Sequence, residues 1–239
     1  PIPPQILNLK ESTFLQTNRE VPRSWLISGP DSKGAGLVSF DEEDALAFEN
    51  QIEASSVASD AFHGSMTGAS EATLRAACAA HGAKPILMTD VIFTSDLNTV
   101  KPGVSDHLNP RRILDGVKQG ISAGGSYLGV PVVGGALEVD SNEGITPVIH
   151  FSAVSILPKV THGILAESRE AHAGDLIALL GSKTGKDGIV GSPGVQIADT
   201  TLEKRLLDFL VECRELGLTR LFVPCGEAGL SGALYSVGS

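Results

Sequence analysis

Short apolar runs recur along the chain between glycine, proline and acidic residues, and most of them have the length of a strand. The first two flank an acidic turn, and the third ends at Thr89 and Asp90. Runs of about four to eight apolar residues between turn residues are typical of strands. We therefore predict strands at residues 36–40, 44–48, 85–88, 130–133, 148–154, 175–180 and 221–223.

Three longer segments carry helical signals. An Ala-rich segment begins at Ser70, a candidate N-cap, and ends before Gly82. Pro110 begins a second segment, whose apolar residues recur at i, i+1, i+4 and i+8. The third has an apolar face that includes Phe209, and Gly217 follows its last turn. These signals predict helices at residues 70–81, 110–123 and 201–216.

The order of these elements predicts an α+β fold with two lobes. Neighbouring strands look antiparallel, so we expect a mixed or antiparallel sheet with flanking helices over residues 34–158. A polar, proline-punctuated arm covers residues 1–33, and a polar connector covers residues 159–171. Residues 172–239 then begin a second, α/β lobe, which is short for an independent domain.

Composition narrows the class of protein. The chain is 42% hydrophobic and carries a net charge of −10, which disfavours nucleic acid as a partner. Cys78, Cys213 and Cys225 have no metal-binding spacing, which indicates free thiols in a reducing compartment. No leader pattern and no apolar stretch of membrane-spanning length is visible. We therefore expect a cytoplasmic protein that binds neither nucleic acid nor membrane.

A glycine-rich loop at residues 181–188 contains Lys183 and Lys186. Its backbone amides and lysines are suited to phosphate oxygens. However, a Walker A loop would need glycine at Leu180 and serine or threonine at Asp187. The loop is therefore either part of a phosphate site or a flexible hairpin, and the segment alone favours the hairpin.

Two aspartates and a pair of glycines are further candidates for a nucleotide or phosphate site. Asp90 follows an apolar run and Asp199 precedes a helix, where carboxylates can hold Mg²⁺ and a nucleotide. Gly134 and Gly135 permit close approach of a ligand, although no dinucleotide-binding fingerprint is present. Alternatively, the glycines serve tight turns and the aspartates serve as caps. No catalytic triad or metal-spaced histidine set can be assigned.

Several segments, taken in order, resemble the large subunit of phosphoribosylformylglycinamidine synthase. Gly82-Ala83-Lys84-Pro85-Ile86 is similar to a Gly-Ala-Arg-Pro-Ile run of that family, which shares an ATP-binding fold with aminoimidazole ribonucleotide synthetase. The other similar segments are residues 29–36, 111–113, 129–135, 174–176, 184–189, 195–197, 203–205 and 228–230.

This resemblance implies a synthetase-like first lobe, ATP and Mg²⁺ as cofactors, and a phosphate-bearing substrate. The family converts an amide to an amidine in purine biosynthesis, at the expense of ATP. By resemblance, Gln196 and Arg111 are substrate-binding residues. Relatives also pair their first lobes through sheet edges. The apolar strands at 130–133 and 148–154 need cover, so we expect a homodimer or a companion subunit.

The chain departs from the family at the catalytic motif. The family's Lys-x-Glu-x-His-Asn-His-Pro run corresponds here to residues 49–56, with Glu49 for the lysine, Gln51 for the metal ligand and Glu53 for the base histidine. A further metal-binding aspartate corresponds to Pro224. Phosphoryl transfer depends on these charges. We therefore expect weak or absent ATP and Mg²⁺ binding and little independent catalysis. The alternative is a non-catalytic nucleotide-binding or assembly subunit.

Overall fold

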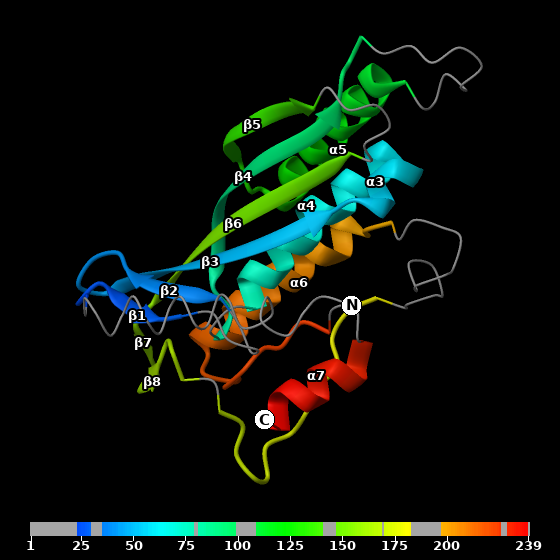
Figure 1. Cartoon of the computed structure of the whole chain (residues 1–239). Helices are drawn as coiled ribbons and strands as arrows, with labels where there is room; N and C mark the ends of the chain where they lie inside the picture. The colour runs from blue at the N-terminus through cyan, green and yellow to red at the C-terminus, as the bar shows by residue number, and fades with distance from the viewer. Residues whose placement is uncertain are drawn as a thin grey trace.

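The computed structural model shows a sheet that is covered on one face by helices (Figure 1). It describes residues 23–29, 35–78, 81–98, 109–140, 147–168, 170–182, 197–225 and 229–238. The strands are β1 (Leu26–Ser28), β2 (Gly36–Ser39), β3 (Asp44–Glu53), β4 (Lys84–Ser95), β5 (Val132–Asp140), β6 (Val148–Pro158), β7 (Val160–Thr161) and β8 (Ile164–Leu165). The helices are α3 (Ser55–Ser59), α4 (Ala61–Cys78), α5 (Pro110–Leu128), α6 (Thr200–Glu215) and α7 (Gly229–Gly238).

The main sheet has six strands in the order β1-β2-β3-β6-β4-β5. β4 and β5 run parallel, joined by α5, and all other neighbours are antiparallel. The parallel pair makes the sheet mixed, one of the two arrangements that we expected, because a helix between two strands allows them to run in the same direction. The mixed sheet with its flanking helices confirms the predicted α+β fold class.

The alternating burial of side chains along β6 shows which face of the sheet packs against the helices. Every second residue of β6 is buried, including Ile149, Phe151 and Leu157, while the residues between them are only partly covered. A strand with this period places one face against a core and the other toward its surroundings. α4 and α5 cover the buried face in Figure 1, and no described helix lies on the other face.

α4 is longer than the sequence predicts. We expected a helix from Ser70, but α4 begins at Ala61 and Ser70 is fully buried within it, so Ser70 is not its N-cap. Asp60 lies at the true start, where its carboxylate accepts a hydrogen bond from the His63 amide at 3.0 Å. The first half of α4 is rich in glycine and serine, which are weak helix formers. Packing against α5 and the sheet stabilises it instead.

Small residues bring α4 and α5 close together. A Cβ atom on Gly120 of α5 would overlap Ser65 Oγ and the Phe62 carbonyl of α4. Ser65 Oγ also donates a hydrogen bond across the seam to the Val117 carbonyl, at 3.2 Å. α5 begins at the N-cap Asn109 and ends at Gly129 in the left-handed conformation, with φ of +74°.

α6 packs on α4 and α5, on the side away from the sheet (Figure 1). Leu207, Leu210 and Cys213 of α6 belong to the same core cluster as the buried side chains of β4, β6, α4 and α5. Phe209, expected on the apolar face, is 45% exposed. α6 thus shares the core of the first lobe, whereas the division of the chain at residues 159–171 stays a prediction.

Two predicted strands are wrong. Residues 175–180 and 221–223 have no strand structure, and neither segment has a hydrogen-bonded strand partner in the described part of the chain. Leu176 is 99% exposed and Leu179 is 68% exposed. An apolar run becomes a strand only where a neighbouring chain segment accepts and donates its backbone hydrogen bonds.

In the described residues, no helix combines the length and the hydrophobicity that crossing a bilayer requires.

Candidate functional site

Two cavities flank the helical layer. Cavity I, of about 580 Å³, lies between the β4–β5 pair and α5. Cavity II, of about 990 Å³, lies between α4, α6, α7 and the segments 171–182 and 217–225. Both volumes fall within the range of roughly 300–1,000 Å³ that is usual for small-molecule sites.

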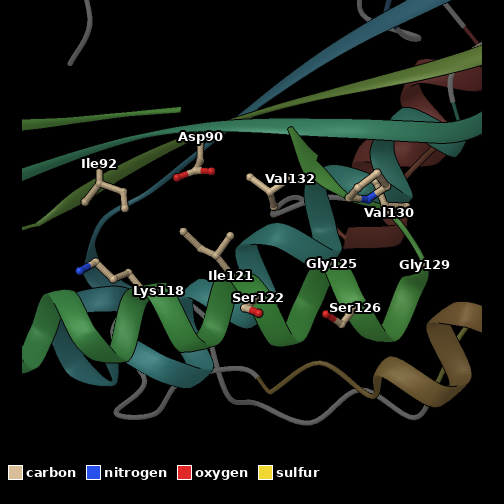
Figure 2. A pocket seen from close by; sticks show the side chains of 11 residues that line it. Asp90, Ile92, Lys118, Ile121, Ser122, Gly125, Ser126, Gly129, Val130 and Val132 are labelled. Atoms are coloured by element: carbon tan, nitrogen blue, oxygen red, sulfur yellow. The ribbon is translucent and has the colours of Figure 1, made fainter. Parts of the chain in front are cut away.

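Asp90 is the ionisable group of β4 in cavity I. Figure 2 shows its carboxyl group between the sheet and α5, facing Ile121 and Ser122. Asp90 lies in the middle of β4 and not at a strand end, because β4 continues to Ser95 between two pairing partners. Burial raises the pKa of the Asp90 carboxyl above its usual value. A half-buried carboxylate without compensation is an unfavourable state for a protein.

The paired glycines lie beside Asp90. Gly134 and Gly135 were expected between strands, but both lie inside β5, with Gly135 opposite Asp90 and Gly134 opposite Thr89. A Cβ atom on Gly135 would lie 2.5 Å from the Asp90 carbonyl oxygen and 3.3 Å from its Oδ1. Glycine at this position is therefore a requirement of the close β4–β5 contact.

Polar contacts dock the start of α6 on α4 at the edge of cavity II. The Ala198 amide donates to Thr67 Oγ1 at 3.1 Å, and the Ser70 hydroxyl donates to the Glu203 carboxylate. Burial raises the pKa of Glu203, and the hydrogen bond from Ser70 opposes that rise. Asp199 accepts from the Leu202 amide at 3.0 Å, so it caps α6, as the alternative interpretation expected.

The β3 residues that correspond to the catalytic motif, Glu49, Gln51 and Glu53, form a row of polar side chains whose polar groups are paired within the chain. We call it the β3 row. Arg75 Nε of α4 pairs with Glu49 Oε1 at 3.1 Å. Gln51 Nε2 donates to Glu53 Oε1 at 3.0 Å, and Ser56 Oγ donates to Glu53 Oε2 at 2.7 Å. Each carboxylate in the row therefore already has a partner within the chain. The positive charge of Arg75 also offsets the repulsion of phosphate that Glu49 alone would cause.

The structure does not bring the predicted site residues into one place. Asp90 lines cavity I and Asp199 lines cavity II. Arg111 lies in the first turn of α5, where it donates to the Leu97 carbonyl at 3.1 Å and to Asn98 Oδ1 at 2.7 Å. The remaining predicted site residues, outside the described residues, are Lys183, Lys186 and Gln196.

The described residues contain no group of three or more histidine, cysteine, aspartate or glutamate side chains that could hold a metal ion.

Cys78, which lines cavity II, has a thiol whose pKa is far from its usual value. Burial raises the pKa of Cys78 to about 12, so its reactive thiolate is scarce near neutral pH. Cys78, Cys213 and Cys225 are all free.

Residues 32–157, more than half of the chain, match the family described as AIR synthase related protein, N-terminal domain. The chain belongs to this family. Among curated relatives, the phosphoribosylformylglycinamidine synthase subunit PurL of Aquifex aeolicus is 28% identical over 228 residues, which is 89% of this chain and 29% of the relative. PurL of Granulibacter bethesdensis is 30% identical over 227 residues, with the same coverage of 89% and 29%. This AIR synthase related chain therefore spans less than a third of these relatives.

Solved structures of PurL share the fold of this AIR synthase related chain. Thermotoga maritima PurL complexed with ATP superposes with a TM-score of 0.69 at 24% identity, covering 98% of this chain and 40% of that chain. The PurLQS structure of Thermotoga maritima gives a TM-score of 0.70 at 24% identity, covering 98% and 39%. The likeness extends beyond the matched family domain into α6 and the segments around it.

Sequence reasoning missed the hydrogen bond between Ser70 of α4 and Glu203 of α6. Ser70 and Glu203 are separated by 133 positions, so no local pattern connects them. The available signal was Glu203 on the inner side of an amphipathic helix, where a carboxylate needs a partner. The contact between Arg75 and Glu49 was also missed, because the two residues are 26 positions apart and no local pattern connects them.

Proposed function

We propose that this PurL-like chain binds a nucleotide weakly in cavity II and has little or no amidine-forming activity on its own. One observation carries the proposal: the β3 row holds glutamate, glutamine and glutamate whose polar groups are paired within the chain. A phosphoryl-transfer site needs free ligands for Mg²⁺ and a base that can be neutral near pH 7.

The chemistry of the β3 row does not fit a Mg²⁺ site of the family's type. Both oxygens of Glu53 accept hydrogen bonds from neighbouring side chains, which leaves each with reduced capacity for a cation. Gln51 supplies a neutral amide where the family has a carboxylate. Mg²⁺ is held by carboxylates and phosphates in near-octahedral geometry. The β3 row therefore does not support a Mg²⁺-dependent phosphoryl transfer of the family's type.

Cavity II is the better candidate for the nucleotide. Its volume suits a mononucleotide, and its lining combines leucines with Arg75 and Asp199. Relatives with the same fold are known as complexes with ATP, ADP and FGAR. Lys183, Lys186 and Gln196 remain proposed contacts of this phosphate-bearing ligand, whereas Gly134, Gly135 and Arg111 lie outside the lining of cavity II. Asp90, in cavity I, is too isolated to serve as the metal-binding group that we expected.

Assembly is the second part of the proposal. β5 is exposed along its whole length, and Val133, Leu137 and Val139 are at least 43% exposed on this edge strand. An apolar strand edge is an attachment site for another strand. A Thermotoga maritima relative is known as the assembly PurLQS. A second copy of the chain or a companion subunit therefore covers β5.

A turnover assay tests the catalytic half of the proposal. Purified protein is given ATP, Mg²⁺, FGAR and an ammonia source, and ADP release and amidine formation are measured. We expect no turnover, and the single change Glu53→His should not restore it, because metal, phosphate contact and base act together. Steady turnover that Glu53→Ala abolishes, but Glu138→Ala on exposed β5 does not, would show that the β3 row is a working active site.

Calorimetric titration with ATP and ADP, with and without Mg²⁺, tests the binding half. We expect weak binding that hardly depends on Mg²⁺ and that is lost when Thr219→Trp fills cavity II.

Light scattering tests assembly. We expect a particle mass well above the chain mass of 24.8 kDa, and Val133→Lys should reduce that particle mass. A monomer at all concentrations, with no binding to a companion subunit, contradicts the assembly half.

A further inference from the structure

Cavity I holds a charged group that the proposed function does not use. The Asp90 carboxyl is half-buried, and its pKa is raised by burial alone, with no hydrogen bond or charged neighbour acting on it among the described residues. Buried carboxylates in proteins are ordinarily paired, because desolvation of an unpaired charge is unfavourable. The Asp90 carboxyl is therefore available, from the cavity, to a cationic or hydrogen-bond-donating group of a ligand.

The backbone keeps this cavity open. Gly135 lacks the Cβ atom that would lie 3.3 Å from Asp90 Oδ1, so the carboxyl group remains accessible from the cavity. Gly125 of α5, also in the lining, allows the Val130 backbone to approach closely, since a Cβ atom there would lie 2.7 Å from the Val130 carbonyl oxygen. The resulting space of about 580 Å³ is lined on its apolar side by Ile92, Ile121 and Val132.

The cavity also has a positive group and two hydroxyl groups, all on α5. In Figure 2, Lys118 rises from α5 at the end of the cavity near Ile92, with Ser122 and Ser126 further along the helix. The amine of Lys118 lies 4.0 Å from Asp115 Oδ1, and its side chain is 60% exposed. An ion pair of this length and exposure is weak, so Lys118 is free to bind another anion.

We propose that cavity I binds a small zwitterion, such as an amino acid or an aminoalkyl phosphate. The ammonium group lies against Asp90, the anionic group lies toward Lys118, and Ser122 and Ser126 donate or accept hydrogen bonds along the ligand. A divalent cation fits less well, because Asp90 is the only carboxylate among the lining residues. A phosphate group alone would be repelled by Asp90 and attracted only by Lys118.

Calorimetry or saturation-transfer NMR on the full chain tests this assignment with γ-aminobutyrate, β-alanine and phosphoethanolamine as zwitterions. Butylamine and butyrate carry only one of the two charges and serve as ligand controls. We expect a zwitterion to bind more tightly than either control. Asp90→Asn should weaken its binding by about tenfold or more, as expected for loss of a charge-assisted contact. The matched control Asp208→Asn, on α6 and outside the lining of cavity I, should leave binding unchanged.

Two further variants separate the parts of the proposal. Lys118→Gln should weaken binding of the zwitterion but not of butylamine. Ser122→Leu, at an exposed helix position, should fill the cavity and abolish binding while the protein stays folded by circular dichroism. The proposal is overturned if no zwitterion binds, if Asp90→Asn binds as wild type does, or if Mg²⁺ with ADP is the ligand that Asp90→Asn and Ser122→Leu eliminate. Because ATP binding is assigned to cavity II, failure here leaves the proposed function intact.

Discussion

The first lobe and the segments that follow it carry the same kind of apolar run but reach different structures. In β6, Ile149, Phe151 and Ala153 are fully buried. In residues 175–180, Leu176 and Ile177 are mostly exposed and form no strand. The runs differ in what surrounds them, since β6 lies between β3 and β4, whereas residues 175–180 have no described strand beside them. Hydrophobicity alone therefore does not make a strand. The presence of a neighbouring strand for backbone hydrogen bonding decides whether an apolar run forms one.

α6 differs from residues 175–180 because its apolar face packs against the core of the first lobe. Leu210 and Cys213 pack into the cluster of α4, α5 and the sheet. The later part of the chain thus contains parts that are anchored to the core of the first lobe, namely α6 and Phe222, and a part that is not, residues 175–180. This comparison can be tested by substitutions whose effects on the free energy of unfolding should differ strongly.

The largest effect is expected at Leu210, which is 3% exposed. Leu210→Ala should lower the free energy of unfolding by about 2–5 kcal/mol, through lost burial and a residual cavity. The same change at Leu176, which is 99% exposed, should cost less than about 0.5 kcal/mol. Urea unfolding followed by circular dichroism measures both. Equal losses at the two leucines would mean that the two regions do not differ as described.

Overpacking the α4–α5 seam should have the next largest effect. Gly120→Ala places a methyl group on Ser65 Oγ and the Phe62 carbonyl, so we expect a loss of about 1–3 kcal/mol. Gly134→Ala is the control, because the nearest atom to its new methyl group is Thr89 Cγ2 at 3.8 Å. The melting temperatures of the two variants give the comparison. A Gly120→Ala protein as stable as wild type would contradict the close contact of the helices.

A smaller effect is expected at the β3 row. Arg75 and Glu49 are 31% and 19% exposed and 3.1 Å apart, so their coupling should amount to about 0.5–1 kcal/mol. A double-mutant cycle with Arg75→Gln and Glu49→Gln measures it in urea. A coupling energy of zero would show that Arg75 does not hold Glu49 in an ion pair, so the Glu49 carboxylate would be available to a ligand.

The smallest effect concerns pH. Because the pKa of Glu203 is raised in the folded protein, the folded state holds its proton more tightly than the unfolded state does. Its contribution to stability is therefore full below the unfolded value of 4.5 and is lost as pH rises through the folded pKa. Glu203→Gln keeps an acceptor for Ser70 and should flatten the dependence of melting temperature on pH above 4.5. An unchanged slope would contradict the burial of this carboxyl group.

The order of elements in the first lobe could be predicted, because strand alternation and helix caps are local signals. Pro110 and Gly129 bound α5 through backbone geometry that the residues themselves favour. The start of α4 could not be predicted, since Gly64 and Gly68 disfavour a helix in isolation and only tertiary packing compensates. β4 extends past Asp90 for a similar reason, because strands on both sides continue its hydrogen bonds.

The candidate sites were less accessible to sequence reasoning. Asp90 could be selected as a carboxylate beside an apolar run, but its environment depends on Gly135 and Lys118, which lie on other elements. The placement of Asp90 and Asp199 in different cavities follows from topology, which no spacing along the chain encodes. Ser70 and Glu203 illustrate the same limit, because their contact spans 133 positions.

The pairing of β3 with β6 has a consequence for how the chain folds during synthesis. Glu53 pairs with Ile149, roughly 100 positions later, and all ten residues of β3 have their inner partners on β6. A ribosome adds about 5–20 residues per second, so β3 must wait about 5–20 s for that partner to be made. High contact order of this kind slows folding. Through that interval the backbone of β3 lacks its inner hydrogen-bonding partner, and Ala45 and Ala47, which the finished fold buries completely, are uncovered. A chaperone or an early companion chain would therefore protect β3 most before β6 emerges.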